Sequence, residues 1–286
     1  MLSYRHAFHA GMHADVLKHC VLVHVLQHML QKDKPFWCID THAGAASYAL
    51  RGQYAKKSGE AQSGIGRLWE RADLPAPLAA YMQVVKADNV DGEGRVGELK
   101  YYPGSPWIAD HLLRPRDRLR LFELHSTEIQ LLQRHFRDAA PRVVAEAGDG
   151  FEGLLSVLPP PPRRGLALID PSYEDKRDYR RTIAALKGGL ERFATGTFMV
   201  WYPQVAREEA QKFPDQLKRV RENGWLHATL TVKSPPAEGV GLYGSGVFLI
   251  NPPYTLPGAL KEALPYLAKV LGQDGAAGFG LEAKLV

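Results

Sequence analysis

Apolar and polar positions along the chain follow two periodicities, one of helices and one of strands. From Ala14 to about Gln31 apolar residues recur at helical spacing without Gly or Pro, which predicts a helix after an irregular, histidine-rich N-terminal arm. The apolar run Pro35–Asp40 predicts a buried strand, and Gly44 with its small neighbours predicts a turn into a second helix. A strand, a glycine turn and a helix in this order are typical of a nucleotide-binding α/β fold.

The segment 51–104 interrupts this alternation. It mixes helical stretches with Gly, Pro and charged residues, shows no clear buried strand and is too long for a simple crossover. We therefore predict an inserted, mainly helical subdomain at 51–104. Residues 1–50 form the arm, the first helix, the first strand and the glycine turn, and residues 105–286 form the remainder of the core. Ser105, followed by Pro106, is typical of the start of a helix.

After residue 105 strands and helices alternate again. Three strands that end at acidic residues are each followed by a helix, and a further strand precedes a helix that ends at Gly224. The last two apolar runs, 225–234 and 244–254, alternate like an antiparallel pair at the edge of a sheet. Five parallel strands followed by such a pair predict an α/β, Rossmann-like fold with a seven-stranded sheet, of the class I S-adenosylmethionine-dependent methyltransferase type rather than the dehydrogenase type.

Composition narrows the possible classes of protein. The 286 residues are 45% hydrophobic and 23% charged, as in an ordinary globular chain with a full core. Cys20 and Cys38 lie in apolar surroundings without metal-ligand spacing, so we expect buried free thiols. No run approaches the ~18–20 apolar residues of a membrane span, and we expect a cytoplasmic protein. A net charge of +5 permits a polyanionic partner such as nucleic acid.

Acidic residues end four successive strands. Ligands of open α/β sheets collect at the carboxyl ends of the strands, near the switch in strand order. A carboxylate after the second strand suits the hydroxyls of a ribose, and one after the third suits the exocyclic amine of adenine. Any one of these residues alone could cap a helix, but four in series favour an adenosine-containing cofactor. The four residues are Asp40, Glu123, Asp149 and Asp170.

Two short motifs share an order of apolar run, carboxylate or amide, proline and aromatic residue. They are Asp170-Pro171-Ser172-Tyr173 and Asn251-Pro252-Pro253-Tyr254. Position favours the first as the catalytic loop, because more than a hundred residues follow it, whereas only the 35 residues 252–286 follow Asn251, with no room to complete the sheet. We expect the second motif to end an edge strand by withholding backbone donors, with Tyr254 at most on the rim of the site.

The first motif carries groups suited to an amine conjugated to an aromatic ring. The Asp170 carboxylate and the Pro171 carbonyl can accept the two hydrogens of adenine N6, whose lone pair is delocalised into the ring. Tyr173 can stack on an extruded base, a contact worth ~1–3 kcal/mol. Once the amine is alkylated it becomes acidic, and Asp170 can take the proton. Most of the acceleration should come from holding N6 in line with the methyl group.

Together these residues resemble the RlmJ family, the bacterial adenine-N6 methyltransferases of 23S ribosomal RNA. The likeness spans essentially the whole chain, through YRHAFHAGMHADVLKH, DTHAG, the helical insertion, FELH, AGDG and DPSYE. It implies S-adenosyl-L-methionine as cofactor, 23S ribosomal RNA as partner and N6-methyladenosine at adenine 2030 as product. The family's substrate-handling arm corresponds to Tyr4, His6 and Lys18. Its cofactor contacts correspond to His19, His42, Ser105, Glu123, Asp149, Gly150 and Asp170, with Asp170 also catalytic.

The sequence departs from the family pattern at two positions. Ser172 stands where many relatives have a second proline, which removes some rigidity from the loop but spares Asp170 and Tyr173. The glycine turn contains only Gly44, with Ala46 where richer versions have glycine, so the resemblance does not fix how the backbone packs there.

Basic runs predict contacts with RNA phosphates. The runs 114–120 and 162–165 are typical of solvated surface, but 176–181 directly follows the catalytic loop, so Lys176 and Arg177 are candidate phosphate contacts. Seven of the eleven histidines fall within the first 42 residues, yet no thiol or carboxylate completes a ligand set, and we expect no metal. We also expect a monomer.

Three rival functions fit the same residues. A DNA adenine-N6 methyltransferase would use the same chemistry, and no residue formally excludes it. A protein-glutamine methyltransferase would use the Asn251 motif at its fourth strand, which the position of that motif disfavours. A non-catalytic nucleic-acid-binding protein could keep the fold, although the intact Asp170 and Tyr173 pair disfavours this.

Overall fold

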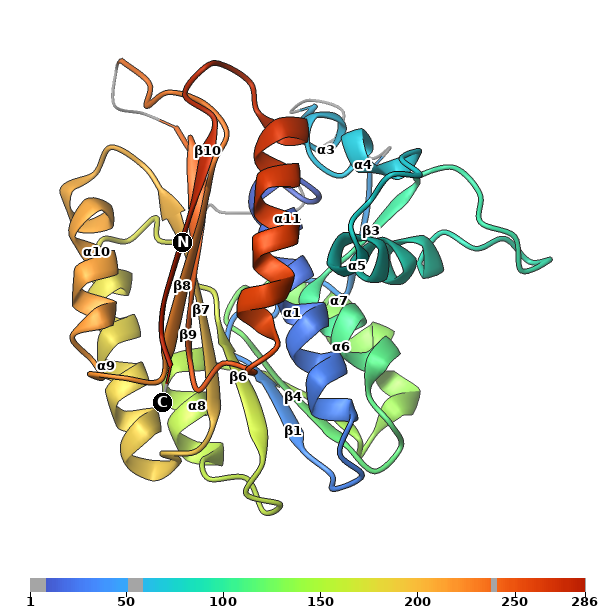
Figure 1. Ribbon diagram of the computed structural model, residues 1–286. Coiled ribbons are helices and arrows are strands. Elements are labelled where there is room, and N and C mark those ends of the chain that lie inside the picture. Colours follow the sequence, from blue (N-terminus) through green and yellow to red (C-terminus); the bar gives the residue numbers. More distant parts are fainter. Residues whose placement is uncertain (1–8, 51–58, 238–240, 286) are drawn as a thin grey trace.

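An eight-stranded sheet runs through the centre of the protein and carries helices on both faces (Figure 1). The computed structural model describes residues 9–50, 59–237 and 241–285. The strand order is β10-β8-β9-β7-β6-β1-β4-β5. The strands are β1 (Trp37–Asp40), β4 (Arg118–Glu123), β5 (Val143–Ala147), β6 (Gly165–Ile169), β7 (Thr197–Gln204), β8 (Trp225–Thr231), β9 (Gly244–Ile250) and β10 (Gly278–Lys284).

The directions of the strands confirm the predicted class I fold and correct its count. Strands β5, β4, β1, β6 and β7 are parallel, and β9 is antiparallel to both β7 and β8. The sheet has eight strands rather than seven, because residues after Asn251 supply a helix and β10, which pairs with β8. The expected edge position of the last pair is also wrong. All seven residues of β9 are buried, which suits a strand between two neighbours, and β10 forms the edge.

Helices from different parts of the chain cover the two faces. On one face α1 packs against α5, α6, α11 and β9, while on the other α9 packs between α8 and α10 (Figure 1). The long helix α1 is buried along most of its length, including its charged residues Asp15 and Lys18. The helices are α1 (His13–Leu30), α5 (Ala76–Ala87), α6 (Ser105–Leu112), α7 (Ser126–His135), α8 (Gly150–Val157), α9 (Arg177–Arg192), α10 (Glu208–Lys218) and α11 (Leu256–Leu271).

The chain after Gly44 differs from the predicted helix. Residues Ser47–Ala49 form strand β2, which pairs antiparallel with β3 (Tyr101–Pro103), and this two-stranded sheet brackets the segment expected to be an insertion. The segment therefore ends in a short strand that the sequence pattern did not predict, and its centre, Tyr102, is fully buried. The helix that follows β1 against the sheet is α6. Between β2 and β3 lie α3 (Glu60–Ser63), α4 (Gly66–Trp69) and α5, which packs on α1 and α11.

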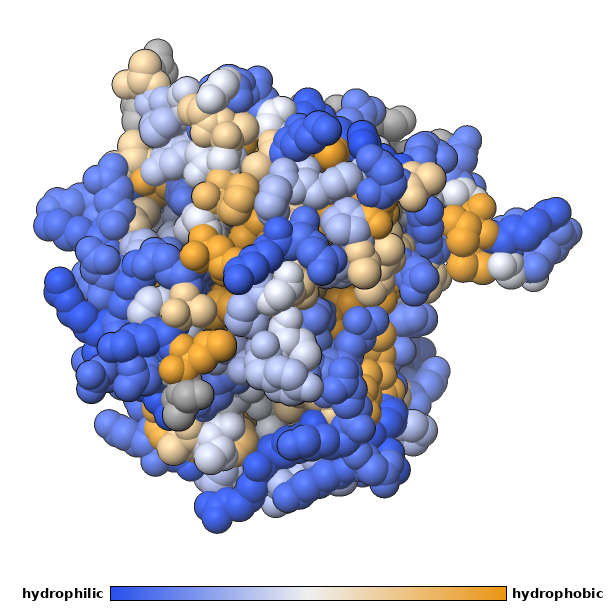
Figure 2. Space-filling view, in the orientation of Figure 1, coloured by the Kyte–Doolittle hydropathy of each residue, from blue (hydrophilic) through white to orange (hydrophobic). Residues whose placement is uncertain are grey.

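The remaining features concern the thiols and the surface. Cys20 and Cys38 are buried and free, as predicted. A 3-10 helix at Arg137–Ala139 leads from α7 toward β5. The face turned to the viewer in Figure 2 is hydrophilic over most of its area, with smaller apolar groups between. Among the described residues, no helix combines the length and the apolarity needed to cross a bilayer.

Candidate active site

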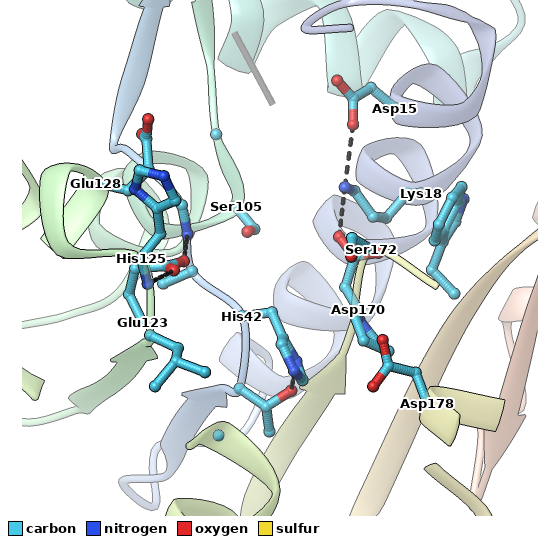
Figure 3. Close-up of a pocket in the computed structure, with 18 of the residues that line it drawn as sticks. Asp15, Lys18, His42, Ser105, Glu123, His125, Glu128, Asp170, Ser172 and Asp178 are labelled. Atoms are coloured by element: carbon cyan, nitrogen blue, oxygen red, sulfur yellow. Dashed lines mark hydrogen bonds and ion pairs between the residues drawn. The ribbon is translucent and has the colours of Figure 1, made fainter. Parts of the chain in front are cut away.

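A cavity, here called the first cavity, lies at the carboxyl ends of the parallel strands. Its walls come from α1, from the loops after β1, β4, β5 and β6, and from β7. Figure 3 shows Lys18 and Asp170 on one side of it and Glu123 with His125 on the other. The predicted site residues that line the first cavity are Lys18, His19, His42, Ser105, Glu123, Asp149, Gly150, Asp170 and Pro171.

A chain of buried charges ties α1 to the loop after β6. Lys18 Nζ donates to Asp170 Oδ2 at 2.6 Å and lies 3.0 Å from Asp15 Oδ1 (Figure 3). Burial alone would lower the pKa of Lys18, but the two carboxylates raise it, so its ammonium is charged. The backbone N–H of Gly11 donates to Asp15 Oδ2 at 2.9 Å. Because an unpaired buried charge is costly, this arrangement fixes the Asp170 side chain at the cavity wall.

The end of β1 contributes a second buried carboxylate. Asp40 Oδ2 accepts a hydrogen bond from Ser105 Oγ at 2.6 Å, and Oδ1 accepts one from the backbone N–H of His42 at 3.2 Å. Burial raises the pKa of Asp40 to about 6. Burial also lowers the pKa of His42 to about 4, so its ring is uncharged near neutral pH. Ser105 is thus held by Asp40 at the start of α6, where Gly104 rather than Ser105 is the N-cap.

Glu123, at the end of β4, fixes two loops at the cavity. Its Oε2 accepts from the backbone N–H of Gly44 at 2.7 Å, and its Oε1 accepts from the backbone N–H of His125 at 2.6 Å. Gly44 has a φ of +61°, and a Cβ there would lie 2.4 Å from the Tyr48 hydroxyl, so the turn requires glycine. Each carboxylate oxygen of Glu123 keeps a further lone pair for a ligand.

Asp149, after β5, caps α8 and forms an ion pair. Its Oδ1 accepts from the backbone N–H of Phe151 at 3.0 Å, and its Oδ2 binds the Arg181 guanidinium. Burial alone would raise the pKa of Asp149, but the hydrogen bond and charge of Arg181 lower it. At Gly150 a Cβ would lie 1.6 Å from the Thr41 carbonyl oxygen, so the loops after β1 and β5 can approach this closely only with glycine.

His19 lies behind these carboxylates, on α1. Its Nδ1 is 2.8 Å from the Tyr102 hydroxyl, and the two rings stack with centroids 5.5 Å apart. The hydroxyl of Tyr81 lies 2.9 Å from that of Tyr102. These contacts connect the first cavity to the two-stranded sheet of β2 and β3 and to α5.

Tyr173 is placed differently from the prediction that it stacks on a base. Only 3% of the residue is exposed, and its ring packs against Tyr179 and Phe213. Its hydroxyl donates to the Trp201 carbonyl oxygen at 2.8 Å. With a φ of +54°, Tyr173 turns the chain away from the first cavity, and its side chain fills the space between α9, α10 and β7. The ring therefore braces the loop and does not line the first cavity.

Trp201 is the aromatic residue that does line the first cavity. It follows Val200, the pairing partner of Ile169, and so lies on β7 beside Asp170, the first residue after β6. Lys18 Nζ lies 5.7 Å from its ring centroid. The sequence pattern did not indicate it, because a tryptophan in an apolar strand usually belongs to the core. Other lining residues that the pattern did not indicate are Asp15, His125, Glu128, Asp178 and Arg181. An acid and a lysine three residues apart within an apolar helix could have indicated the pair Asp15 and Lys18.

The predicted phosphate contacts Lys176 and Arg177 do not line the first cavity. Lys176 and Arg177 are exposed at the start of α9, and Arg177 Nε donates to Asp175 Oδ2 at 2.7 Å. Their contact with RNA phosphate stays a prediction. Tyr4 and His6 lie outside the described residues. Within residues 9–50, 59–237 and 241–285, no three His, Cys, Asp or Glu side chains are grouped to hold a metal ion.

The Asn251 motif lies at the opposite end of the strands. Because β9 is antiparallel to β7, its last residue, Ile250, pairs with Phe198 near the start of β7. Asn251 Nδ2 donates to the carbonyl oxygens of Ala194 and Gly196, at 2.9 and 2.7 Å. Tyr254 is 78% exposed and lies against His28, away from the rim that the prediction allowed it. The motif ends a strand, as expected, although that strand lies inside the sheet.

A sheet of this order, with acidic residues at the carboxyl ends of its parallel strands, defines a class I methyltransferase fold. A profile of the family described as "Ribosomal RNA large subunit methyltransferase D, RlmJ" matches residues 33–281. The chain belongs to this RlmJ family.

Individual relatives agree over nearly the full length. A protein of Haemophilus influenzae named "Ribosomal RNA large subunit methyltransferase J" is 43% identical over 282 residues, or 99% of this chain and 98% of the relative. One of the same name from Escherichia coli is 46% identical over 276 residues, 96% of each. A crystal structure of a Legionella pneumophila protein superposes with a TM-score of 0.85 at 35% identity, covering 96% of this chain and 98% of that one.

Proposed function

We propose that this protein transfers a methyl group from S-adenosyl-L-methionine to N6 of adenine 2030 in 23S ribosomal RNA, in the cytoplasm. The observation that carries the proposal is the Asp170 carboxylate, held by buried Lys18 at the wall of the first cavity. The names of the curated relatives support a ribosomal RNA substrate. The choice of base and atom rests on the chemistry of the Asp170 loop.

The residues of the first cavity fit the proposed cofactor. When bound, S-adenosyl-L-methionine supplies an electrophilic methyl group on a positively charged sulfur. Glu123 has a free lone pair on each carboxylate oxygen for the ribose hydroxyls, and ionised Asp149 can accept from the amine of the cofactor's adenine. Uncharged His42 adds no repulsion toward a cation. Carboxylates outnumber ammonium groups around the cavity, which favours a sulfonium ligand.

Asp170 and Pro171 hold the amine that accepts the methyl group. The carboxylate and the Pro171 carbonyl oxygen each accept one N6 hydrogen, which orients the nitrogen lone pair. After alkylation the surplus proton moves from N6 to an Asp170 oxygen and then to water. The Lys18 ammonium holds Asp170 in a fixed direction until that transfer. The ring beside the base is that of Trp201, and Tyr173 supports the loop from behind.

Methylation of isolated ribosomal RNA tests this function directly. Purified protein is incubated with the donor and unmodified 23S ribosomal RNA, and the RNA fragments are mapped by mass. We expect one added methyl group in the fragment that contains adenine 2030, at N6. A parallel reaction with DNA of the same sequence tests the DNA rival, and cofactor titration by calorimetry tests the non-catalytic one. Methylation of DNA alone, or cofactor binding without any transfer, would contradict the proposal.

A further inference from the structure

A second cavity adjoins the first at the Asp170 loop. Its walls come from the start of α1, from the loop after β6, from the end of β7 and from the residues that follow β8. Met12, Ser172 and Trp201 line both cavities. In Figure 3 Ser172 lies next to Asp170 in the first cavity. A nucleic acid strand whose base reaches Asp170 therefore has adjoining space for a second nucleotide.

Three residues that line the second cavity carry a buried polar atom without a partner. Among the described residues, none of His13 Nδ1, Tyr179 Oη and Trp201 Nε1 makes a hydrogen bond, although these residues are only 7%, 3% and 9% exposed. Burial lowers the pKa of His13 to about 4, so it is a neutral imidazole. Buried polar groups are nearly always paired in folded proteins, so three unpartnered groups around one cavity point to a ligand that supplies the missing partners.

Cationic groups lie on the same walls. Lys233 lines the second cavity and forms no ion pair with a carboxylate of the described residues. Arg207 Nη1 donates to the Tyr173 carbonyl oxygen at 2.9 Å, which leaves other guanidinium N–H groups for a ligand. The acidic residues on these walls are Glu60, which binds His9 Nδ1 at 2.8 Å, and exposed Glu174. A phosphate in the second cavity can therefore bind to the ammonium of Lys233, which has no carboxylate partner, and to the guanidinium of Arg207, which is only partly used.

We propose that the second cavity binds the nucleotide next to the methylated adenine, with its phosphate at Lys233 and Arg207. Trp201 Nε1 donates to that nucleotide, and His13 Nδ1 pairs with its sugar or base edge. This inference rests on the proposed function and deepens it, because it assigns a subsite for single-stranded RNA on one side of the target base. The ligand class is a nucleoside phosphate unit within a strand, recognised mainly through its charge.

Lys233→Gln tests the subsite. The matched control is Lys187→Gln, at an exposed residue of α9 that lines neither cavity. Binding of a short single-stranded RNA containing the target adenine is measured by fluorescence anisotropy at several salt concentrations, and single-turnover methylation is measured separately. We expect Lys233→Gln to weaken RNA binding about 5- to 10-fold and to reduce the salt slope by about 1, whereas Lys187→Gln changes neither. Affinity for the donor stays unchanged in both.

Shortened RNAs locate the contact. In one RNA the target adenine is the 5′-terminal nucleotide, and in another it is the 3′-terminal nucleotide. For the wild type we expect one of these to bind as weakly as the full RNA binds to Lys233→Gln, with no further loss when the two changes are combined. Trp201→Phe, which keeps a ring but removes the N–H, should show the same dependence on that one side.

The outcomes separate the subsite from the reaction. Additive losses for both shortened RNAs, or RNA binding by Lys233→Gln equal to that of Lys187→Gln, would overturn the subsite even when the wild type methylates RNA. Absence of methylation by the wild type would overturn the proposed function, while the anisotropy measurements would still decide whether the second cavity binds a phosphate.

Discussion

The ends of β6 and β9 carry nearly the same motif but are built for different purposes. Strand β6 runs parallel to β1 and β7, so Asp170 emerges at the edge where the other acidic strand ends meet. Strand β9 runs the other way, so Asn251 emerges at the opposite edge. The same order of polar residue, proline and aromatic residue therefore does not by itself indicate a functional site. The direction of the strand that delivers it decides whether it meets a cavity.

The two polar side chains also differ in what surrounds them. Both Nδ2 hydrogens of Asn251 are donated to main-chain carbonyls, and its Oδ1 accepts from Arg221 Nη1 at 2.7 Å. Such an amide is fully used in holding the loop before β7. Asp170 is fixed instead by Lys18, at one oxygen of a carboxylate that faces the first cavity. An amide with both donors used braces the chain, whereas a held carboxylate beside a cavity can do chemistry.

The largest expected effect separates the two motifs by rate. Asp170→Asn keeps the shape of the side chain but removes the charge and the proton acceptor, and we expect kcat to fall by at least ~10³-fold. Methylation reactions quenched at a series of times measure the rate. Calorimetry should show an affinity for the cofactor within about tenfold of that of the wild type. Near-normal turnover would remove Asp170 from the reaction.

Asn251→Ala is the counterpart of that variant at the other edge. We expect its kcat to stay within about twofold, because no reacting group is changed. The free energy of unfolding should fall by about 1–3 kcal/mol, because buried carbonyls lose their partner and alanine is disfavoured at a φ of +51°. A large loss of rate in a folded Asn251→Ala protein would reverse the assignment of the two motifs.

The buried charges behind Asp170 give the largest expected effect on stability. Lys18→Met leaves Asp15 and Asp170 facing each other without a cation, and we expect the free energy of unfolding to fall by about 3–5 kcal/mol. Urea denaturation at pH 7 measures it. Adding Asp15→Asn to Lys18→Met should recover part of the loss, because one buried carboxylate is then neutral. If the double variant is less stable than the single one, the two carboxylates do not interact as the distances imply.

A histidine in the antiparallel part of the sheet should make stability depend on pH without affecting the reaction. Burial lowers the pKa of His227, on β8, to about 4, and its Nε2 lies 2.9 Å from the Tyr202 hydroxyl. The unfolded chain takes up this proton near pH 6.5, so stability is lost as the pH falls from 6.5 toward 4, by at most about 3 kcal/mol. Denaturation curves across this range should show a smaller slope for His227→Gln, whereas kcat at pH 7 stays near the wild-type value.

The two tyrosines of the motifs give the smallest effects. Tyr173→Phe loses the buried hydrogen bond to the Trp201 carbonyl oxygen and should cost about 1 kcal/mol of stability. Tyr254→Ala changes a side chain that is mostly in solvent and should alter stability by no more than about 0.5 kcal/mol. Thermal denaturation of the two variants side by side measures both. A larger loss for Tyr254→Ala would show that the exposed ring packs against something that the fold needs.

Local patterns in the sequence determined much of this protein. The spacing of apolar residues predicted α1 and the alternation from β4 to α10, because a periodicity reports which face of a segment is buried. The acidic residues that end the parallel strands could be found for the same reason. Once a strand and its direction are known, its last residue lies at the ligand-binding edge of the sheet.

Only the tertiary structure decided how distant segments meet. Three features depend on partners far away in the chain, which no local periodicity reports. They are the place of β9 inside the sheet, the pairing of β10 with β8 and the pairing of β2 with β3. The same holds for the side chains. Trp201 lines the first cavity, because strand register places it beside Asp170. Tyr173 does not line the first cavity, because a turn of the backbone places its side chain in the core.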